Sequence, residues 1–176
     1  MKWLTSDNKM LGYELMKAYP NISCFSTTRH GGCSKGNYTS FNCNGYCGDE
    51  AEDVNRNREL LRSLLPGESV ELVIPHQTHS DHVKVVDTIH VNTELEGVDA
   101  LVTDIPGYCL CVSTADCVPV LFIRYSKEGS GCHSCRMAWY GGPDCREDSF
   151  GHERSIRFAR EGSHCLHRSQ YFIGGF

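Results

Sequence analysis

No stretch of this sequence is apolar over the ~20 residues that a membrane-spanning helix needs. Residues 1–20 interleave Asp7, Lys9, Glu14 and Lys17 with apolar residues, so they also lack the continuous apolar segment of a signal peptide. Both absences predict a soluble, cytoplasmic protein with no membrane partner.

The chain also has no excess of basic residues over acidic ones. The chain has 17 Lys and Arg against 22 Asp and Glu, which gives a formal net charge of −5. Surfaces that bind nucleic acid attract phosphates with clustered positive charge, and this balance does not provide it. We therefore expect small molecules or proteins as partners rather than nucleic acid. The length of 176 residues favours a single domain.

Cysteine, in contrast, is abundant, with 11 residues in the chain. In a short secreted protein such a count would predict a disulfide framework. An odd number without a signal peptide favours a reducing compartment instead. The sequence therefore predicts free thiols, one of which could be a metal ligand.

A helix is predicted over Asp53–Leu64, because apolar residues recur there at helical spacing and Pro66-Gly67 follows. Short β-rich runs then succeed one another along the chain: Val70–Ile74, His82–Val86, Ala100–Thr103, Tyr108–Ser113 and Val118–Ile123. These patterns alone predict a protein with both α and β structure.

Two connecting regions are also informative. Phe25–Asp49 is rich in Gly, Ser, Thr and Asn, which predicts hairpins and loops. Ser113–Asp116 is a short polar segment between two apolar runs, which predicts a turn between two buried strands. Polar groups in such a turn must find partners.

From Gly129 onward the composition changes. This part has no valine, one leucine, no lysine and six arginines, whereas every lysine lies upstream. It shows no helix or strand periodicity, so we predict no regular element in it. A disordered or variable C-terminal region is the simplest interpretation.

Two residues stand out as candidate metal ligands. His79 ends the motif His76-Gln-Thr-His79, and Cys117 lies in Thr114-Ala-Asp-Cys-Val-Pro119. Either could be structural, as a surface imidazole or a small core thiol. Both nevertheless lie where loops meet a predicted sheet, which is where binding sites gather. Imidazole and thiolate both suit zinc, and a catalytic zinc site usually takes three protein ligands.

Six blocks occur in an order that resembles the YfiH, or laccase-domain, family: the Ser-Thr-Arg-like block with Gly31-Gly32, Ser40-Phe-Asn42, Gly48-Asp49 with Asn57-Arg58, Gln77-Thr-His79, Ala100–Asp104 and Ala115–Leu121. The resemblance spans roughly Phe25–Phe122. It implies an α/β (α+β) fold of mixed β-sheets packed together with helices outside. It also implies phosphorolysis of adenosine, inosine and methylthioadenosine, with adenosine deamination alongside.

The same resemblance implies a zinc site. Its ligands would be His79, Cys117 and a histidine in a downstream His-Ala-Gly-Trp-Arg-Gly block, which this chain lacks as written. The metal would orient phosphate or activate a water. Arg29, Asn42, Arg58 and Gln77 are candidates for binding ribose or phosphate. They are at least as well explained as structural turn and cap residues.

The missing block can be written in another reading frame. Codons for Ser134–Tyr140, read one base later, permit His-Ala-Gly-Trp-Arg-Gly, and the genetic code forces its tryptophan and its last glycine. The codons for Tyr140–His152 and for His167–Phe172 also permit family-like segments in the same shifted frame. We hypothesise a frameshift between about Lys127 and Cys132. Residues 1–128 would then form a partial family domain, 129–176 an out-of-frame tail, and the chain would have little activity.

Two other functions remain open. A non-enzymatic metal- or partner-binding protein could use Cys132-His-Ser-Cys135 and the tail histidines, although a lone CxxC is weak evidence. A copper-dependent polyphenol oxidase, or laccase, is the third interpretation. It lacks the additional histidine clusters that a multicopper centre requires, so copper is the less favoured metal.

Overall fold

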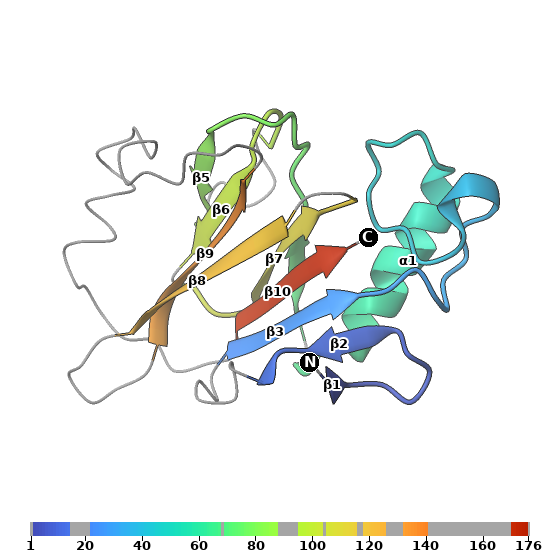
Figure 1. The fold of residues 1–176 in the computed structure, drawn as a ribbon, viewed down its shortest axis with the longest axis horizontal. Coiled ribbons are helices and arrows are strands. Elements are labelled where there is room, and N and C mark those ends of the chain that lie inside the picture. The colour runs from blue at the N-terminus through green and yellow to red at the C-terminus, as the bar shows by residue number, and fades with distance from the viewer. Residues whose placement is uncertain are drawn as a thin grey trace.

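The computed structural model describes residues 2–14, 22–67, 69–87, 95–103, 105–115, 118–125, 132–140 and 170–175. Within them the chain forms two β-sheets and the helix α1 (Ala51–Leu64) (Figure 1). The predicted ligand Cys117 and its neighbour Asp116 lie outside the described residues. In the part that is described, no helix is long and apolar enough to cross a membrane.

The larger sheet has six strands in the spatial order β1-β2-β3-β10-β7-β4. Its strands are β1 (Lys2–Trp3), β2 (Met10–Gly12), β3 (Ile22–Thr27), β10 (Gln170–Gly175), β7 (Tyr108–Ser113) and β4 (Glu71–Val73). The last four run parallel to one another, whereas β1 and β2 join antiparallel at the edge. The carboxyl ends of four neighbouring strands therefore meet at one edge of this sheet.

The smaller sheet has the order β5-β6-β9-β8. Its strands are β5 (Val83–Val85), β6 (Ala100–Thr103), β9 (Cys132–Tyr140) and β8 (Val118–Tyr125). β5 and β6 are parallel, and β9 runs antiparallel to both of its neighbours. β6 and β9 contact β7, so this sheet packs against the larger one.

Alternate residues of the larger sheet enter two different cores. Cys109 and Cys111 of β7 join the cluster that contains Leu61 of α1. Leu110 and Val112 of the same strand join the cluster that contains Leu101 of β6. Successive side chains of a strand point to opposite faces, so the larger sheet lies between α1 and the smaller sheet. A strand buried on both faces reads as a continuous apolar run, as this one does.

The helix is the best-predicted element. It begins at Ala51, two residues before the predicted start, and ends at the predicted Leu64. Acidic residues in its first turn and Arg62 in its last turn complement the helix dipole. Val54 and Leu61 face the core, and the buried Asn57 lies between them.

The predicted mixed α/β architecture is confirmed, and each β-rich run after the helix contains a strand of the structure. Two details of the prediction are wrong. Residues 28–49 form loops and a short 3-10 helix (Gly36–Tyr38) rather than hairpins. The region after Gly129, expected to have no regular element, contributes β9 and β10. The domain boundary at 128 and the frameshift stay predictions.

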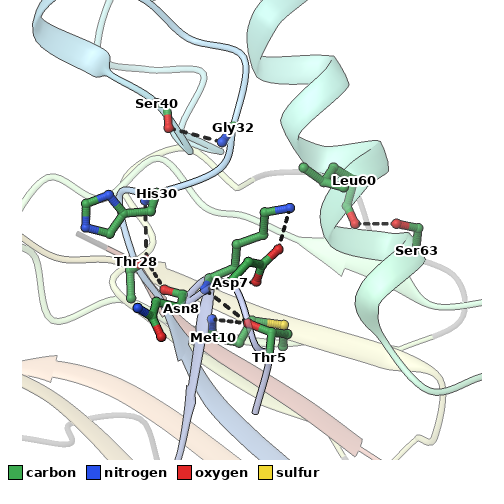
Figure 2. A network of polar contacts seen from close by, with 11 residues as sticks. Thr5, Asp7, Asn8, Met10, Thr28, His30, Gly32, Ser40, Leu60 and Ser63 are labelled. Carbon is green, nitrogen blue, oxygen red and sulfur yellow. Dashed lines mark hydrogen bonds and ion pairs between the residues drawn. The ribbon is translucent and has the colours of Figure 1, made fainter. Parts of the chain in front are cut away.

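Polar contacts tie the first hairpin to the loop that follows β3 (Figure 2). The hydroxyl of Thr28 donates to the carbonyl of Asn8 at 2.7 Å, and accepts the N–H of His30 at 3.3 Å. The N–H of Gly32 donates to the hydroxyl of Ser40 at 3.1 Å. The loop after β3 is therefore anchored before it reaches the cavity described below.

Candidate active site

A cavity of about 630 Å³ opens at the edge where the parallel strands β3, β4 and β7 end. Its wall includes Thr27 of β3, the segment after β4, and the last residues of β7 with Thr114 and Ala115. Loop residues between Asn37 and Cys47 cover it from the side of α1. Ligands of open α/β sheets bind at the carboxyl ends of the strands, and this volume is in the range of small-molecule sites.

The segment after β4 contributes three residues to the cavity lining, His76, Gln77 and His79. Gln77 is fixed by its side-chain Oε1, which accepts the N–H of Ser113 at 2.7 Å. This bond joins the end of β4 to the end of β7. The bond therefore holds the Gln77 amide in a fixed orientation relative to the sheet. Its NH2 group is the donor that can bind another partner.

His79 has a left-handed backbone conformation, with φ of 62°. The carboxylate of Asp99 accepts the N–H groups of Thr78, His79 and Ser80 at 3.1, 3.0 and 2.8 Å. Asp99 is 2% exposed and also lines the cavity. Left-handed residues with a Cβ are uncommon, so the predicted ligand is held in a specific conformation by its surroundings.

His76 forms a second polar cluster in the wall. Its Nδ1 lies 2.7 and 2.8 Å from the two carboxylate oxygens of Glu96, so Nδ1 carries the proton that the carboxylate accepts. The ring stacks on Tyr46 with the centroids 4.3 Å apart and the planes 10° from parallel. These contacts fix both the ring plane and the tautomer of His76.

The other predicted binding residues make structural hydrogen bonds. Arg29 donates from Nε and Nη2 to the carbonyl of Thr39, at 3.0 and 2.9 Å. Asn42 donates to the carboxylate of Asp49 at 2.9 Å, and Arg58 donates to the carbonyl of Cys43 at 2.9 Å. Arg29 and Asn42 line the cavity, whereas Arg58 supports the covering loop without lining it. Their roles in binding substrate stay predictions.

Two thiols, those of Cys43 and Cys111, belong to residues that line the same cavity. Burial, with a smaller contribution from the neighbouring Cys111, raises the pKa of Cys43 to about 12, whereas the charge of Arg58 opposes the shift. Burial also raises the pKa of Cys109 well above the ordinary value. All six cysteines with described side chains are free, as predicted. These protonated thiols act as small apolar residues of the core.

The imidazole of His79 and the thiolate of Cys117 are both ligand types that suit zinc, and of these two residues the structure describes His79. No group of three or more His, Cys, Asp or Glu among the described residues is arranged to hold a metal. The described part of the chain contributes the imidazole of His79, at the cavity wall. Cys117 follows Ala115, the last cavity-lining residue after β7, but is itself outside the description.

Sequence reasoning missed Asp99, Glu96 and Tyr46. A signal for Asp99 was present, because a lone acidic residue directly before the apolar run Ala100–Val102 must either be solvated or bind several donors. No comparable signal marks Tyr46 or Glu96. The contact of Tyr46 with His76 depends on how the covering loop folds over the cavity, and that of Glu96 depends on the β-bridge that pairs Glu96 with His76.

Comparison with known proteins places the chain in a family. Residues 23–137 match the family model described as multi-copper polyphenol oxidoreductase laccase. The chain therefore belongs to this laccase-domain family.

Similar proteins of known name support membership of this family. The chain is similar to a purine nucleoside phosphorylase of Bacteroides thetaiotaomicron, with 49% identity over 78% of this chain and 53% of the relative. It is 37% identical to adenosine deaminase RL5 of an unknown prokaryotic organism, over 62% of this chain and 45% of the relative. The chain thus spans about half the length of the curated relatives it matches.

The fold is shared with solved structures as well. The hypothetical protein YfiH of Bacillus licheniformis aligns with a TM-score of 0.60 and 25% identity, over 77% of this chain and 51% of that structure. YlmD of Geobacillus stearothermophilus aligns with a TM-score of 0.53 and 31% identity, over 65% of this chain and 43% of that structure. The mixed α/β fold is therefore that of the YfiH structures.

Proposed function

We propose that this chain is a purine nucleoside phosphorylase of the laccase-domain family that uses zinc. The observation that carries the proposal is the position of His79, held in a defined conformation in the wall of a cavity at the carboxyl edge of the parallel strands. The names of the relatives supply the substrate class, which is a purine nucleoside with phosphate.

His79 and Cys117 would hold the zinc, as a neutral imidazole and a thiolate. When bound, zinc supplies Lewis acidity that polarises phosphate or water. A third ligand would come from the His-Ala-Gly-Trp-Arg-Gly block, which the chain as printed does not contain. Two protein ligands hold a metal less tightly than three, so we expect this chain to be less active than a product that has the block.

The remaining residues of the wall bind and orient. Arg29 uses two of its donors on the carbonyl of Thr39, so toward phosphate it would contribute mainly its positive charge. The NH2 group of Gln77 would donate to a ribose or phosphate oxygen. The aromatic pair Tyr46 and His76 offers a flat, partly apolar surface on which a purine base could stack.

Two reactions would follow from two positions of attack. Attack of phosphate on C1′ of the nucleoside breaks the glycosidic bond, and the purine leaves with a proton. Attack of water on C6 of adenosine displaces ammonia, which is deamination. The second reaction is supported by the similarity to adenosine deaminase RL5.

The test is an assay of inosine phosphorolysis with the zinc-loaded full chain. We expect hypoxanthine release that depends on phosphate and is lost in His79→Ala and in Cys117→Ala. A reading-frame-corrected product should release hypoxanthine faster than the 176-residue chain. Equal rates would contradict the frameshift, and the absence of release from both proteins would contradict the proposed function.

A further inference from the structure

We propose that Asp99 is the residue that positions His79 for metal binding, through the backbone of the 78–80 segment. This inference rests on the proposed function, in which His79 is a zinc ligand. It assigns a role to a buried carboxylate that accepts the backbone N–H of the ligand residue.

Four donor groups of one short segment, three backbone N–H groups and one hydroxyl, lie within hydrogen-bond distance of the Asp99 carboxylate. Its Oδ1 accepts the N–H of His79 at 3.0 Å. Its Oδ2 accepts the N–H groups of Thr78 and Ser80 at 3.1 and 2.8 Å, and lies 2.8 Å from the hydroxyl of Ser80. That hydroxyl also contacts the carbonyl of Gly97. Hydrogen bonds to a charged acceptor are the stronger kind, and the three backbone N–H groups satisfy the buried carboxylate, while the single hydroxyl proton of Ser80 is shared with the carbonyl of Gly97.

Successive N–H groups converge on one anion in a nest, where the backbone changes handedness between neighbouring residues. His79 provides that change, with φ of 62°. A left-handed conformation is disfavoured for a residue with a Cβ, so the segment would leave it if the acceptor were removed. Because the direction of a side chain follows from its backbone angles, such a change would turn the imidazole away from its present position.

The acceptor itself is firmly placed. The N–H groups of Asp99 and Ala100 both donate to the carbonyl of His82, at 3.1 Å each. Asp99 directly precedes β6, whose Leu101 is completely buried in the core between the sheets. The smaller sheet therefore fixes the position of the Asp99 carboxylate. The carboxylate in turn fixes the backbone conformation of His79, which lines the cavity.

The substitution Asp99→Asn tests this inference. It keeps the size of the side chain but replaces one acceptor oxygen by an NH2 group, which cannot accept the converging N–H groups. Asp53→Asn is the matched control, since Asp53 is a largely buried carboxylate on α1 that pairs with Arg56. Two quantities are measured in the full chain: zinc affinity by competition with a chelator, and hydrogen exchange of the amides of residues 78–80 without metal.

We expect Asp99→Asn to weaken zinc binding by about 10- to 100-fold, as loss of a ligand-orienting partner does. Amide exchange at 78–80 should become at least about tenfold faster. Asp53→Asn should leave both quantities unchanged. A role limited to folding would lower the unfolding midpoint in urea without changing the affinity of the folded protein, and that result would overturn the proposal.

If Asp99→Asn does not fold, Ser80→Ala replaces it. This variant removes one of the four donors and keeps the carboxylate, and we expect about threefold weaker zinc binding. Unchanged affinity in Ser80→Ala would then overturn the proposal. If the parent chain binds no zinc, the proposed function fails by itself, and the exchange rates at 78–80 alone decide whether Asp99 positions His79.

Discussion

Asn57 shows how much one buried amide can organise. Its side-chain Oδ1 accepts the N–H of Cys33 at 2.7 Å. Its Nδ2 donates to the hydroxyl of Ser34 and to the carbonyls of Ser40 and Asn42, at 2.9, 3.1 and 2.8 Å. The residue is completely buried, and together with Arg58, which donates to the carbonyl of Cys43, it fixes the loop that covers the cavity to α1.

Asn57→Ala should therefore destabilise the protein by about 2–4 kcal/mol, because it leaves several buried polar groups without partners. Urea unfolding followed by circular dichroism measures the change. Asn55→Ala is the control, since Asn55 is exposed on the same helix and should change stability by less than about 0.5 kcal/mol. Similar losses in the two variants would contradict the role given to Asn57.

The thiols provide a second prediction for single residues. Cys33 and Cys47 are exposed, whereas Cys43 has a pKa raised to about 12 and Cys109 is completely buried with a raised pKa. Only the thiolate reacts rapidly with iodoacetamide. Among the six cysteines with described side chains, Cys33 and Cys47 should be alkylated first in the folded chain at pH 8, as peptide mass spectrometry would show. Labelling of Cys43 as fast as that of Cys47 would count against the described packing.

At the scale of elements, the sequence predicted what depends on local pattern. The helix has helical spacing and a proline after its end, and β7 is an uninterrupted apolar run, so both were predictable. The position of β10 between β3 and β7 is a pairing of segments far apart in the chain, and no local pattern encodes it. The composition after Gly129 did not predict a strand, so β9 and β10 were both missed.

The position of β10 makes a prediction about truncation. A fragment of residues 1–128 loses β9 and β10, which leaves β3 without its link to β7 and exposes unpaired strand edges. We expect a lower midpoint of thermal unfolding and more aggregation than in the full chain. Differential scanning fluorimetry and light scattering measure both. A fragment as stable and monomeric as the full chain would show that the two tail strands add nothing to the sheets.

At the scale of the whole molecule, the site draws on segments from both sheets and from the loop before α1. The sequence pointed to His79 because of its motif and to Gln77 because of the resemblance, and both line the cavity. Asp99 and the stacked Tyr46 could not be predicted with their partners, since their contacts span 20 and 30 residues of sequence. Local motifs thus locate the candidate ligand, whereas the tertiary fold supplies the groups that hold it.

We propose that His79 and Cys117 bind one zinc ion at this cavity. X-ray absorption at the zinc edge of the loaded full chain tests it most directly. We predict a sulfur at about 2.3 Å and nitrogen at about 2.0–2.1 Å. Cys117→Ser should remove the sulfur, and His79→Ala should reduce the nitrogen signal. A spectrum that neither substitution changes would contradict the account.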